Sequence, residues 1–355
     1  MSCGCHVAVT DQFDAGLGHW RLGRPRHASI IFKMMRVSSL YEYDWGMKKT
    51  LARYLDERLG QGRAYVIKAE VMMALGLSTT AFAASAARLI KQRRLASPKQ
   101  GFYLILRPED RAAGGPDPAR WIDPLMHHLG MDYRISLLRA AAFHGASHQA
   151  AQLFQVIVPR QLRSIAIDRQ RIQFVYQAPQ AFATVNQPPW LGQLKTDAGF
   201  AKVAGIELVL LDAVRYFHQA AGLNGAAQII HDLGARADPR KLARAAAVYE
   251  NSTARRLGYL LEYFGHARQA ASLRPLARKA KSLKPLDPSV RLVASLARGA
   301  KAPEAATWKL SLNVRLEIDA WFARLDRLSS ERLMPKGIKQ PPAPRRNMFD
   351  DDRSA

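Results

Sequence analysis

Cysteine is nearly absent from this 355-residue sequence, which holds only Cys3 and Cys5, both beside the first residue. Two cysteines this close together cannot cross-link a core, so the chain is not a disulfide-stabilised scaffold. A structural zinc site needs four ligands, usually in two separated pairs, and no second pair follows Cys3, Cys5 and His6. We therefore expect no metal, and a reducing cytoplasmic setting.

Long apolar runs are also missing. The most apolar stretch, residues 203–214, is interrupted by Glu207 and Asp212 and is shorter than the ~18 residues of a membrane span. The first thirty residues contain no uninterrupted apolar segment of the kind that signal peptides carry. The sequence predicts neither a membrane protein nor a secreted one.

Acidic residues are scarce, with 29 Asp and Glu against 53 Lys and Arg, which gives a net charge of +24. The hydrophobic share of 48% is ordinary for a folded protein and excludes a mostly disordered chain. Such a positive field attracts polyanions, and nucleic acid is the first candidate. A solvated basic surface without a particular partner is the alternative.

Signatures of catalysis are lacking as well. His144 and His148 have the spacing of a zinc helix but lack the glutamate that follows the first histidine in metalloproteases. We find no phosphate-binding glycine loop followed by Lys-Ser/Thr and no Gly-x-Ser-x-Gly nucleophile turn. The only dense acidic run, residues 350–352, lies in a polar tail that is ill-suited to holding catalytic metal ions. The sequence predicts no enzyme and no cofactor.

What the sequence does contain is a regular pattern from Met47 onward. Apolar residues at helical spacing end at the glycines of 60–62, a short β-like run follows, and two helices flank a tight turn at 75–78. A turn and a β-strand complete the series. The expected elements are helix 47–59, strand 64–67, helix 68–74, helix 79–92 and strand 102–106. This order is typical of a winged helix-turn-helix.

The helix from Thr79 is the candidate recognition helix. Ser78 is suited to cap it, and its outward face combines small or polar side chains with cations, while no acidic residue occurs between Glu70 and Glu109. In this prediction Thr80 and Ala84 approach base edges, and basic side chains hold phosphates. A small helical domain for protein contacts is the alternative. The predicted DNA-binding residues are Ser78, Thr79, Thr80, Ala84, Arg88, Lys91, Arg93, Arg94 and Lys99.

A Gly/Pro-rich segment, residues 113–118, predicts a linker to a second, mixed helix–sheet domain with a helical C-terminal half. The predicted fold class is α+β. The predicted divisions are an arm at 1–46 that is flexible or a mis-assigned start, a winged helix-turn-helix at 47–115, the second domain at 116–334 and a disordered tail at 335–355. The basic segment 268–284 is either a second phosphate-contacting patch or a solvated face.

Two segments of the second domain resemble AbiEi-type antitoxins of type IV toxin–antitoxin, or abortive-infection, systems. One is the run from Tyr133 to Pro159, and the other is Leu257–Gly-Tyr-Leu-Leu-Glu-Tyr-Phe–Gly265. The order of a winged helix before a mixed α/β region is similar too. The resemblance covers about residues 47–286.

The resemblance implies a non-enzymatic transcriptional regulator with two roles. Its N-terminal domain would bind operator DNA and repress its own operon, with paired binding if the operator is palindromic. Its C-terminal domain would neutralise a nucleotidyltransferase-like toxin, without the need for a stable complex. The alternative function is a basic interaction module that binds RNA or an acidic protein partner without operator specificity.

Overall fold

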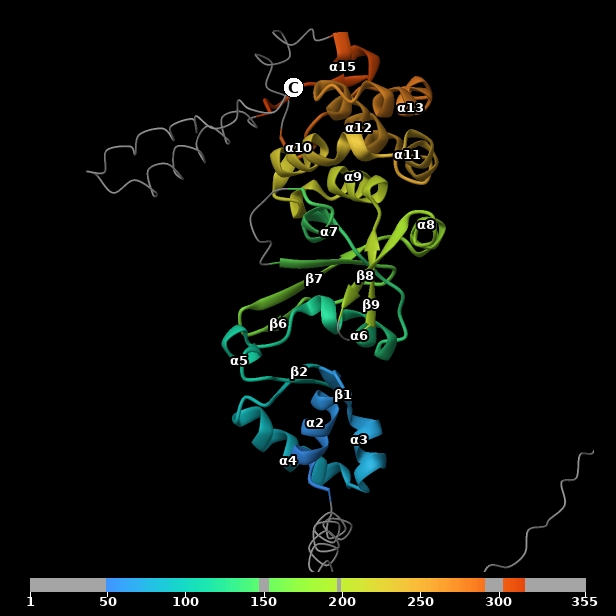
Figure 1. Ribbon diagram of the computed structural model, residues 1–355. Helices are drawn as coiled ribbons and strands as arrows, with labels where there is room; N and C mark the ends of the chain where they lie inside the picture. Colours follow the sequence, from blue (N-terminus) through green and yellow to red (C-terminus); the bar gives the residue numbers. More distant parts are fainter. Residues whose placement is uncertain (1–48, 147–152, 197–198, 291–302, 317–355) are drawn as a thin grey trace, which may run out of the picture. The chain divides into compact units, whose positions relative to one another are not determined.

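A computed structural model of the chain describes residues 49–146, 153–196, 199–290 and 303–316 (Figure 1). Contacts divide the chain into two units, residues 1–49 and 50–355, and every element discussed below belongs to the second. The predicted arm at 1–46, the predicted tail at 335–355 and His148 lie outside the described residues.

The first elements form three helices and a small sheet. Helix α2 begins after Thr50, whose hydroxyl accepts a hydrogen bond from the Arg53 backbone N–H at 3.4 Å. Three strands pair antiparallel in the order β1-β3-β2. Leu55, Val71 and Phe82 from the three helices are buried together against the sheet. The elements are α2 (Leu51–Gly60), β1 (Tyr65–Ile67), α3 (Lys68–Leu75), α4 (Thr79–Lys91), β2 (Leu95–Lys99) and β3 (Phe102–Ile105).

Strand β3 belongs to two cores at once. Ile105 is buried in the core under α2, α3 and α4, with Tyr103 packed against it. Phe102 and Leu104 are fully buried in the larger core that follows along the chain. Because successive side chains of a strand point to opposite faces, the small sheet lies between the two cores.

The segment predicted as a linker is packed rather than free. It holds the short helices α5 (Asp110–Ala113) and η1 (Pro118–Arg120), and Gly114, Gly115 and Pro116 between them are buried. Gly114 has φ of +80°, and a Cβ there would collide with the side chain of Asp168. The glycine therefore permits a close approach of the Asp168 side chain to this segment, which the Gly/Pro pattern predicts only as a linker.

A six-stranded mixed sheet forms the centre of the chain, with strand order β6-β7-β5-β4-β9-β8. Strand β5 runs parallel to β7 and antiparallel to β4, which runs parallel to β9. The prediction of a mixed helix–sheet architecture is confirmed. The elements are α6 (Ile122–His128), β4 (Arg134–Ile135), α7 (Leu137–Phe143), β5 (Leu153–Val158), β6 (Ile165–Ile167), β7 (Gln170–Tyr176), α8 (Pro179–Val185), β8 (Leu191–Thr196) and β9 (Gly199–Ala204).

Two sequence expectations for this region are wrong. The apolar pattern of residues 133–143 predicts one helix, but they divide into strand β4 and helix α7 because Arg134 and Ile135 pair with β5 and β9. The sequence of residues 180–201 predicts loop or weak strand, but they contain α8, β8 and the start of β9. In both places the sheet partners, which lie far away in sequence, decide the structure.

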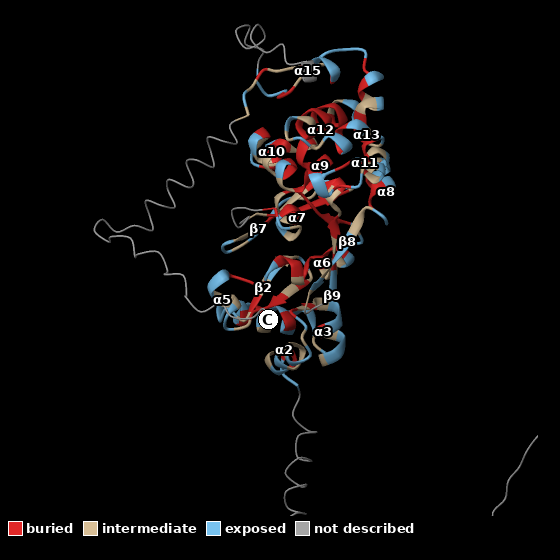
Figure 2. Cartoon of the chain, turned by 45° about the horizontal axis from the view of Figure 1, so that its top comes forward, coloured by how far each residue is buried: buried red, intermediate tan, exposed pale blue. Residues whose placement is uncertain are grey.

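Helices dominate the C-terminal part. Helix α9 is buried over all but its first and last residues, and Figure 2 shows the buried ribbon running through α9 and α12. Gly258 of α12 lies against the buried ring of Trp308, where a side chain would not fit. The elements are α9 (Ile206–Arg215), η2 (Phe217–Gln219), α10 (Gly222–Leu233), η3 (Gly234–Arg236), α11 (Pro239–Ala246), α12 (Asn251–Tyr263), α13 (Ala267–Arg278), β10 (Lys284–Pro285), α15 (Pro303–Thr307) and β11 (Leu310–Ser311).

Among the described residues, no single helix has the length and apolar character to cross a membrane. Helices α3 and α4 meet those two criteria only when taken together, and they are bent by 113° with respect to each other.

Candidate functional site

The α4 face

A tight turn and a cap place helix α4. Gly76 ends α3 in the left-handed conformation, with φ of +60°, and its N–H donates to the Met72 carbonyl. Ser78 then begins α4, and its hydroxyl accepts a hydrogen bond from the Ala81 N–H at 3.2 Å. The predicted capping role of Ser78 thus matches the observed geometry. Phe82, Ala86 and Leu89 bury the opposite side of the helix.

The outward side of α4 is exposed to solvent and carries small side chains. Thr79, Thr80 and Ala84 are all exposed, and the Thr80 hydroxyl lies 3.0 Å from that of Ser78. Ala83 and Ala87 extend this surface. With so few long side chains, the helix backbone can come close to a flat or grooved partner. We call this surface, together with Arg88 and Lys91 at its end, the α4 face.

The predicted cations differ in their surroundings. Arg88, Lys91 and Arg93 are exposed, and Arg93 has φ of +53°, in the turn that leaves α4. Lys99 is half-buried at the end of β2, beside the Gln100–Gly101 turn. Arg94 instead forms an ion pair with Asp56 of α2, with Nη2 2.5 Å from Oδ1. This ion pair connects the segment after α4 to α2.

One exposed residue near the α4 face was not singled out from the sequence. Met73 of α3 is 83% exposed, which is unusual for a large apolar side chain on a helix that packs against a core. Helical periodicity alone gives no sign of this, because Met73 lies among apolar residues of the same short helix. The exposure was visible only in three dimensions.

The buried polar cluster

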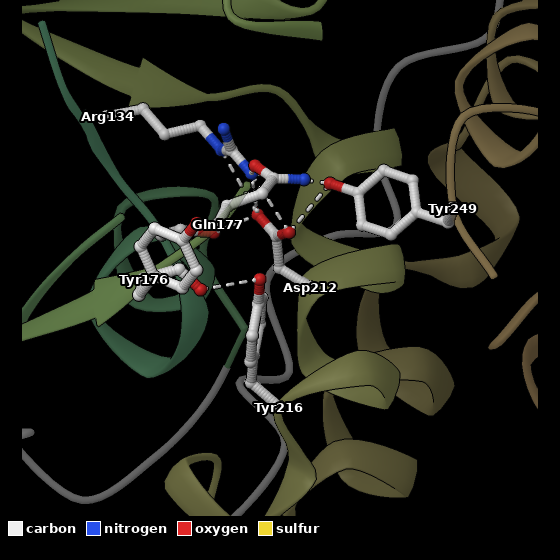
Figure 3. Close-up of polar contacts among 7 residues, drawn as sticks. Arg134, Tyr176, Gln177, Asp212, Tyr216 and Tyr249 are labelled. Atoms are coloured by element: carbon white, nitrogen blue, oxygen red, sulfur yellow. Dashed lines mark hydrogen bonds and ion pairs between the residues drawn. The ribbon is translucent and has the colours of Figure 1, made fainter. Parts of the chain in front are cut away.

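A second group of polar side chains is buried in the C-terminal part (Figure 3). The Arg134 guanidinium and the Asp212 carboxylate are both fully buried, and Nη2 lies 3.1 Å from Oδ1. Ser136 and Tyr249 each donate a hydroxyl hydrogen bond to Asp212 at 2.7 Å. Gln177 accepts from Arg134 Nη2 at 2.7 Å. We call these five residues the buried polar cluster.

In the buried polar cluster, the negative charge of Asp212 stabilises the positive charge of Arg134. Burial lowers the pKa of Arg134, but the charge and hydrogen bonds of Asp212, together with Tyr249 and Tyr216, raise it by more, so the guanidinium pKa lies above its ordinary value. Burial also raises the pKa of the Tyr249 hydroxyl, and Asp212 adds to that rise. Arg134 is therefore charged and Tyr249 is a neutral hydrogen-bond donor at physiological pH.

The buried polar cluster joins four parts of the chain. Arg134 begins strand β4 and Ser136 follows it, Asp212 belongs to α9, Gln177 follows β7, and Tyr249 precedes α12. All its members are closed to solvent, so the arrangement stabilises the domain and gives substrates no access. The sequence did hold a signal for it: Asp212 lies between the apolar residues Leu211 and Ala213 in the middle of α9, and a buried carboxylate requires a partner.

Within the described residues, no three His, Cys, Asp or Glu side chains are grouped as metal ligands would be. His144, from the predicted histidine pair, lies at the end of α7, and its Nε2 is 2.7 Å from the Ala204 carbonyl oxygen. That hydrogen bond gives His144 a structural role between α7 and the segment before α9.

Comparison with known proteins identifies the C-terminal part. Residues 134–263 match the family model of the AbiEi antitoxin C-terminal domain, so the resemblance predicted from the sequence is confirmed for this segment. No curated protein matches the chain. Among solved structures, the RV2827C protein from Mycobacterium tuberculosis is similar, with a TM-score of 0.52 at 16% identity, covering 77% of this chain and 94% of that one. At that identity the likeness concerns the fold alone.

Proposed function

We propose that this chain, whose residues 134–263 form an AbiEi antitoxin C-terminal domain, is an antitoxin that binds operator DNA and represses its own operon. The observation that carries the DNA-binding part is the exposed α4 face, with small side chains in its middle and cations at its end. Under this proposal, residues 51–105 form a winged helix-turn-helix, with α4 as the recognition helix and the β2–β3 hairpin as the wing.

The chemistry of the α4 face supports a position in the major groove. Thr80 and Ala84 are short enough to let the helix approach base edges, where a threonine hydroxyl forms hydrogen bonds and an alanine methyl contacts the methyl group of thymine. Arg88 and Lys91 at the end of the helix would hold phosphates, and Lys99 would contact the flanking backbone from the wing. Arg94 contributes less in this proposal, because Asp56 already neutralises it.

The antitoxin domain implies a toxin as functional partner. We propose a nucleotidyltransferase-like toxin of a type IV system, neutralised in the cytoplasm without catalysis by this chain. The support is the family match over the C-terminal domain. Co-expression tests this directly, because growth inhibition by the toxin encoded beside this gene should be relieved by the full chain.

The DNA-binding proposal is tested by salt titration of the full chain with a duplex from the region upstream of its own gene. Each phosphate contact contributes about 0.9 to the slope of log K against log salt. The Arg88→Ala/Lys91→Ala double variant should therefore flatten the slope by about two. Lys195→Ala, on exposed β8 far along the chain, is the control and should leave the slope unchanged. Equal slopes for the double variant and wild type would refute the assignment of the α4 face.

A second candidate function rests on the region from α11 to β10. Residues 236–284 hold twelve Lys and Arg but only three acidic residues. Each acid is engaged locally: Asp238 caps α11, Glu250 pairs with Arg215, and Glu262 pairs with Arg274. Arg255 and Arg256 are buried, and the exposed cations form a basic surface suited to RNA or an acidic protein. These exposed cations are Arg236, Arg240, Arg244, Arg268, Arg278, Lys279, Lys281 and Lys284. Binding that ignores DNA sequence and depends only on these cations would favour this second function.

A further inference from the structure

Helices α11 and α13 form a pair that carries cations and no acidic residue. The two helices pack against each other, and both contact α12 (Figure 1). Neither helix contains Asp or Glu, whereas each contains three Lys and Arg. A polyanion is therefore the complementary partner, and the shape of the pair narrows the class of polyanion.

Hydrogen bonds and buried side chains hold the helix pair together. Gln269, near the start of α13, donates its side-chain amide to the Ala235 carbonyl at 3.0 Å and to the Ala237 carbonyl at 3.2 Å, just before α11. The two helices therefore begin side by side. Leu242 of α11 and Leu273 of α13 are fully buried on the inner sides. Because the inner sides are anchored in this way, the outer sides are held in fixed positions.

The outer sides of both helices present arginines. Arg240 and Arg244 lie one turn apart on α11. Arg268 and Arg278 lie ten residues apart on α13, which is about 15 Å along a helix. All four side chains are exposed, and among the residues that the structure describes no ion pair or side-chain hydrogen bond engages them. These charges are therefore available to a partner.

The residues between the arginines of α13 are small. Ala271 and Pro275 lie exposed on the outer side of this helix, between Arg268 and Arg278. None of the exposed large apolar side chains of the described residues belongs to α11 or α13. We call this outer side of the pair the α11–α13 surface, which comprises Arg240, Arg244, Arg268, Ala271, Pro275 and Arg278.

This composition favours nucleic acid over an acidic protein. Protein interfaces contain an apolar core with aromatic side chains, and the α11–α13 surface offers none. A phosphate backbone requires cations and close approach, and the planar guanidinium of arginine pairs with phosphate in a bidentate manner. The small side chains at the middle of the surface permit that approach.

The width of the helix pair distinguishes RNA from DNA. One helix is about 10 Å across and packed helices lie about 8–10 Å apart, so the pair spans about 20 Å. The major groove of B-DNA is about 12 Å wide, which admits one helix but excludes two that lie side by side. The minor groove of an A-form RNA duplex is wide and shallow, and it displays 2′-hydroxyl groups. A broad surface of small side chains with arginines around them fits that groove.

We propose that the α11–α13 surface binds double-stranded RNA through its phosphates and 2′-hydroxyl groups, without reading the base sequence. The inference rests on the second candidate function and narrows the partner of that function to RNA. The α4 face takes no part in it.

Fluorescence anisotropy of the full chain with a labelled RNA duplex of about 16 base pairs, the length that shape-reading RNA domains cover, tests the proposal. The Arg240→Ala/Arg268→Ala variant should flatten the slope of log K against log salt by about two, at the ~0.9 per phosphate known for duplex DNA. Arg163→Ala/Arg169→Ala removes the same charge from exposed positions beside β6. This control should keep the wild-type slope.

A second variant tests the shape of the surface without a change of charge. Ala271→Trp places a large ring between the arginines of α13 and should weaken RNA binding, because the ring holds the duplex away from them. Ala112→Trp, at an exposed position of α5, is the control and should bind RNA as wild type does. Circular dichroism of each variant verifies that the fold is kept.

The DNA duplex from upstream of the gene separates this inference from the DNA-binding proposal. Arg240→Ala/Arg268→Ala should bind that DNA as tightly as wild type. A loss of DNA affinity in this variant would overturn the inference, because the surface would then belong to the DNA site. A wild-type chain that binds the RNA duplex but shows no preference for its own upstream DNA would support the inference while refuting operator recognition.

Three further results would overturn the choice of RNA. One is an unchanged salt slope for Arg240→Ala/Arg268→Ala on RNA, and another is an unchanged RNA affinity for Ala271→Trp. The third is polyglutamate that binds more tightly than RNA, which assigns the surface to an acidic protein and keeps the second candidate function. If neither RNA nor polyglutamate binds, the second candidate function fails together with this inference.

Discussion

The ion pair between Arg134 and Asp212 is the residue-scale feature on which the antitoxin domain most depends. Asp212 sits fully buried between a guanidinium and two hydroxyl donors. Removal of one partner of a buried pair leaves an uncompensated charge, at a cost of about 3–5 kcal/mol. Asp212→Ala should therefore lower the free energy of unfolding by about that amount, measured by urea denaturation.

A double-mutant cycle separates the pair from the packing around it. The Arg134→Met/Asp212→Leu variant removes both charges and fills the space with apolar atoms, so it should be clearly more stable than Asp212→Ala alone. If the double variant is as unstable as the sum of both single changes, the two side chains act independently and the charge account of the buried polar cluster is wrong.

Asp132 gives the domain a pH dependence. Burial raises the pKa of this carboxyl, but hydrogen bonds from Lys202, the Tyr133 N–H and Asn186 lower it by more, so the folded pKa lies below the ordinary 3.8. A lowered carboxyl pKa stabilises the folded state above 3.8, and this contribution disappears as the pH falls through the folded value. The stability difference between wild type and Asp132→Asn should be constant at neutral pH and vanish in strong acid.

Urea unfolding of wild type and Asp132→Asn from neutral pH to about pH 3 measures this difference. The change should begin as the pH falls below 3.8, because the folded pKa of Asp132 lies below that value. A gap that widens as the pH falls would contradict the assignment of Asp132.

At the scale of elements, strand β3 links the two cores. Phe102 is fully buried, stacks on Tyr65 with ring centres 5.3 Å apart, and packs toward Trp121 of the second core. Loss of such a ring costs about 3–5 kcal/mol. Because Phe102 anchors strand β3 in the larger core while Ile105 and Tyr103 of the same strand pack in the first one, Phe102→Ala should also separate their unfolding into two transitions. Phe82→Ala, buried only beneath α4, is the matched control and should weaken the first core alone.

Circular dichroism and tryptophan fluorescence follow the two transitions, since Trp121 reports on the second core. Coincident single transitions in Phe102→Ala would show that the strand does not couple the halves.

The sequence predicted elements that have strong local signals. Helix α4 was predicted from the cap at Ser78 and the spacing of Phe82, Ala86 and Leu89, and its observed bounds differ from the prediction by one residue. The short apolar runs at 153–158, 164–167 and 172–176 predict three strands, and they match β5, β6 and β7 to within two residues. Strand β4 was missed because two residues carry too little pattern, and their conformation depends on partners about 20 and 70 residues away.

The functional features also fall into those that neighbouring residues encode and those that form between distant residues. The α4 face could be predicted because the cap, the small residues and the cations are consecutive in the chain. The Arg94–Asp56 ion pair could not, since its partners are 38 residues apart. The burial of Gly114, Gly115 and Pro116 was equally hidden, because the Gly/Pro pattern of residues 113–118 predicts a linker and gives no sign that the segment packs.

At the scale of the whole molecule, strand β3 connects the α4 face, which we propose binds DNA, to the part of the chain that matches the AbiEi antitoxin C-terminal domain. The positive charge of +24 supports attraction to nucleic acid but does not choose a sequence. A preference for one DNA sequence has to come from the short side chains of α4. The proposal therefore concerns the specificity of DNA binding more than its affinity.

Fluorescence anisotropy measures the affinity of the full chain for a duplex from upstream of its gene and for a scrambled duplex of the same composition. Both affinities are measured at physiological salt, and their ratio is the sequence preference. Specific regulators typically favour their site by about a thousand-fold or more. The account predicts a preference of that order, which Thr80→Ala and Arg88→Ala should reduce. Equal affinity for the two duplexes would contradict the proposal and leave only a basic surface that binds DNA without sequence preference.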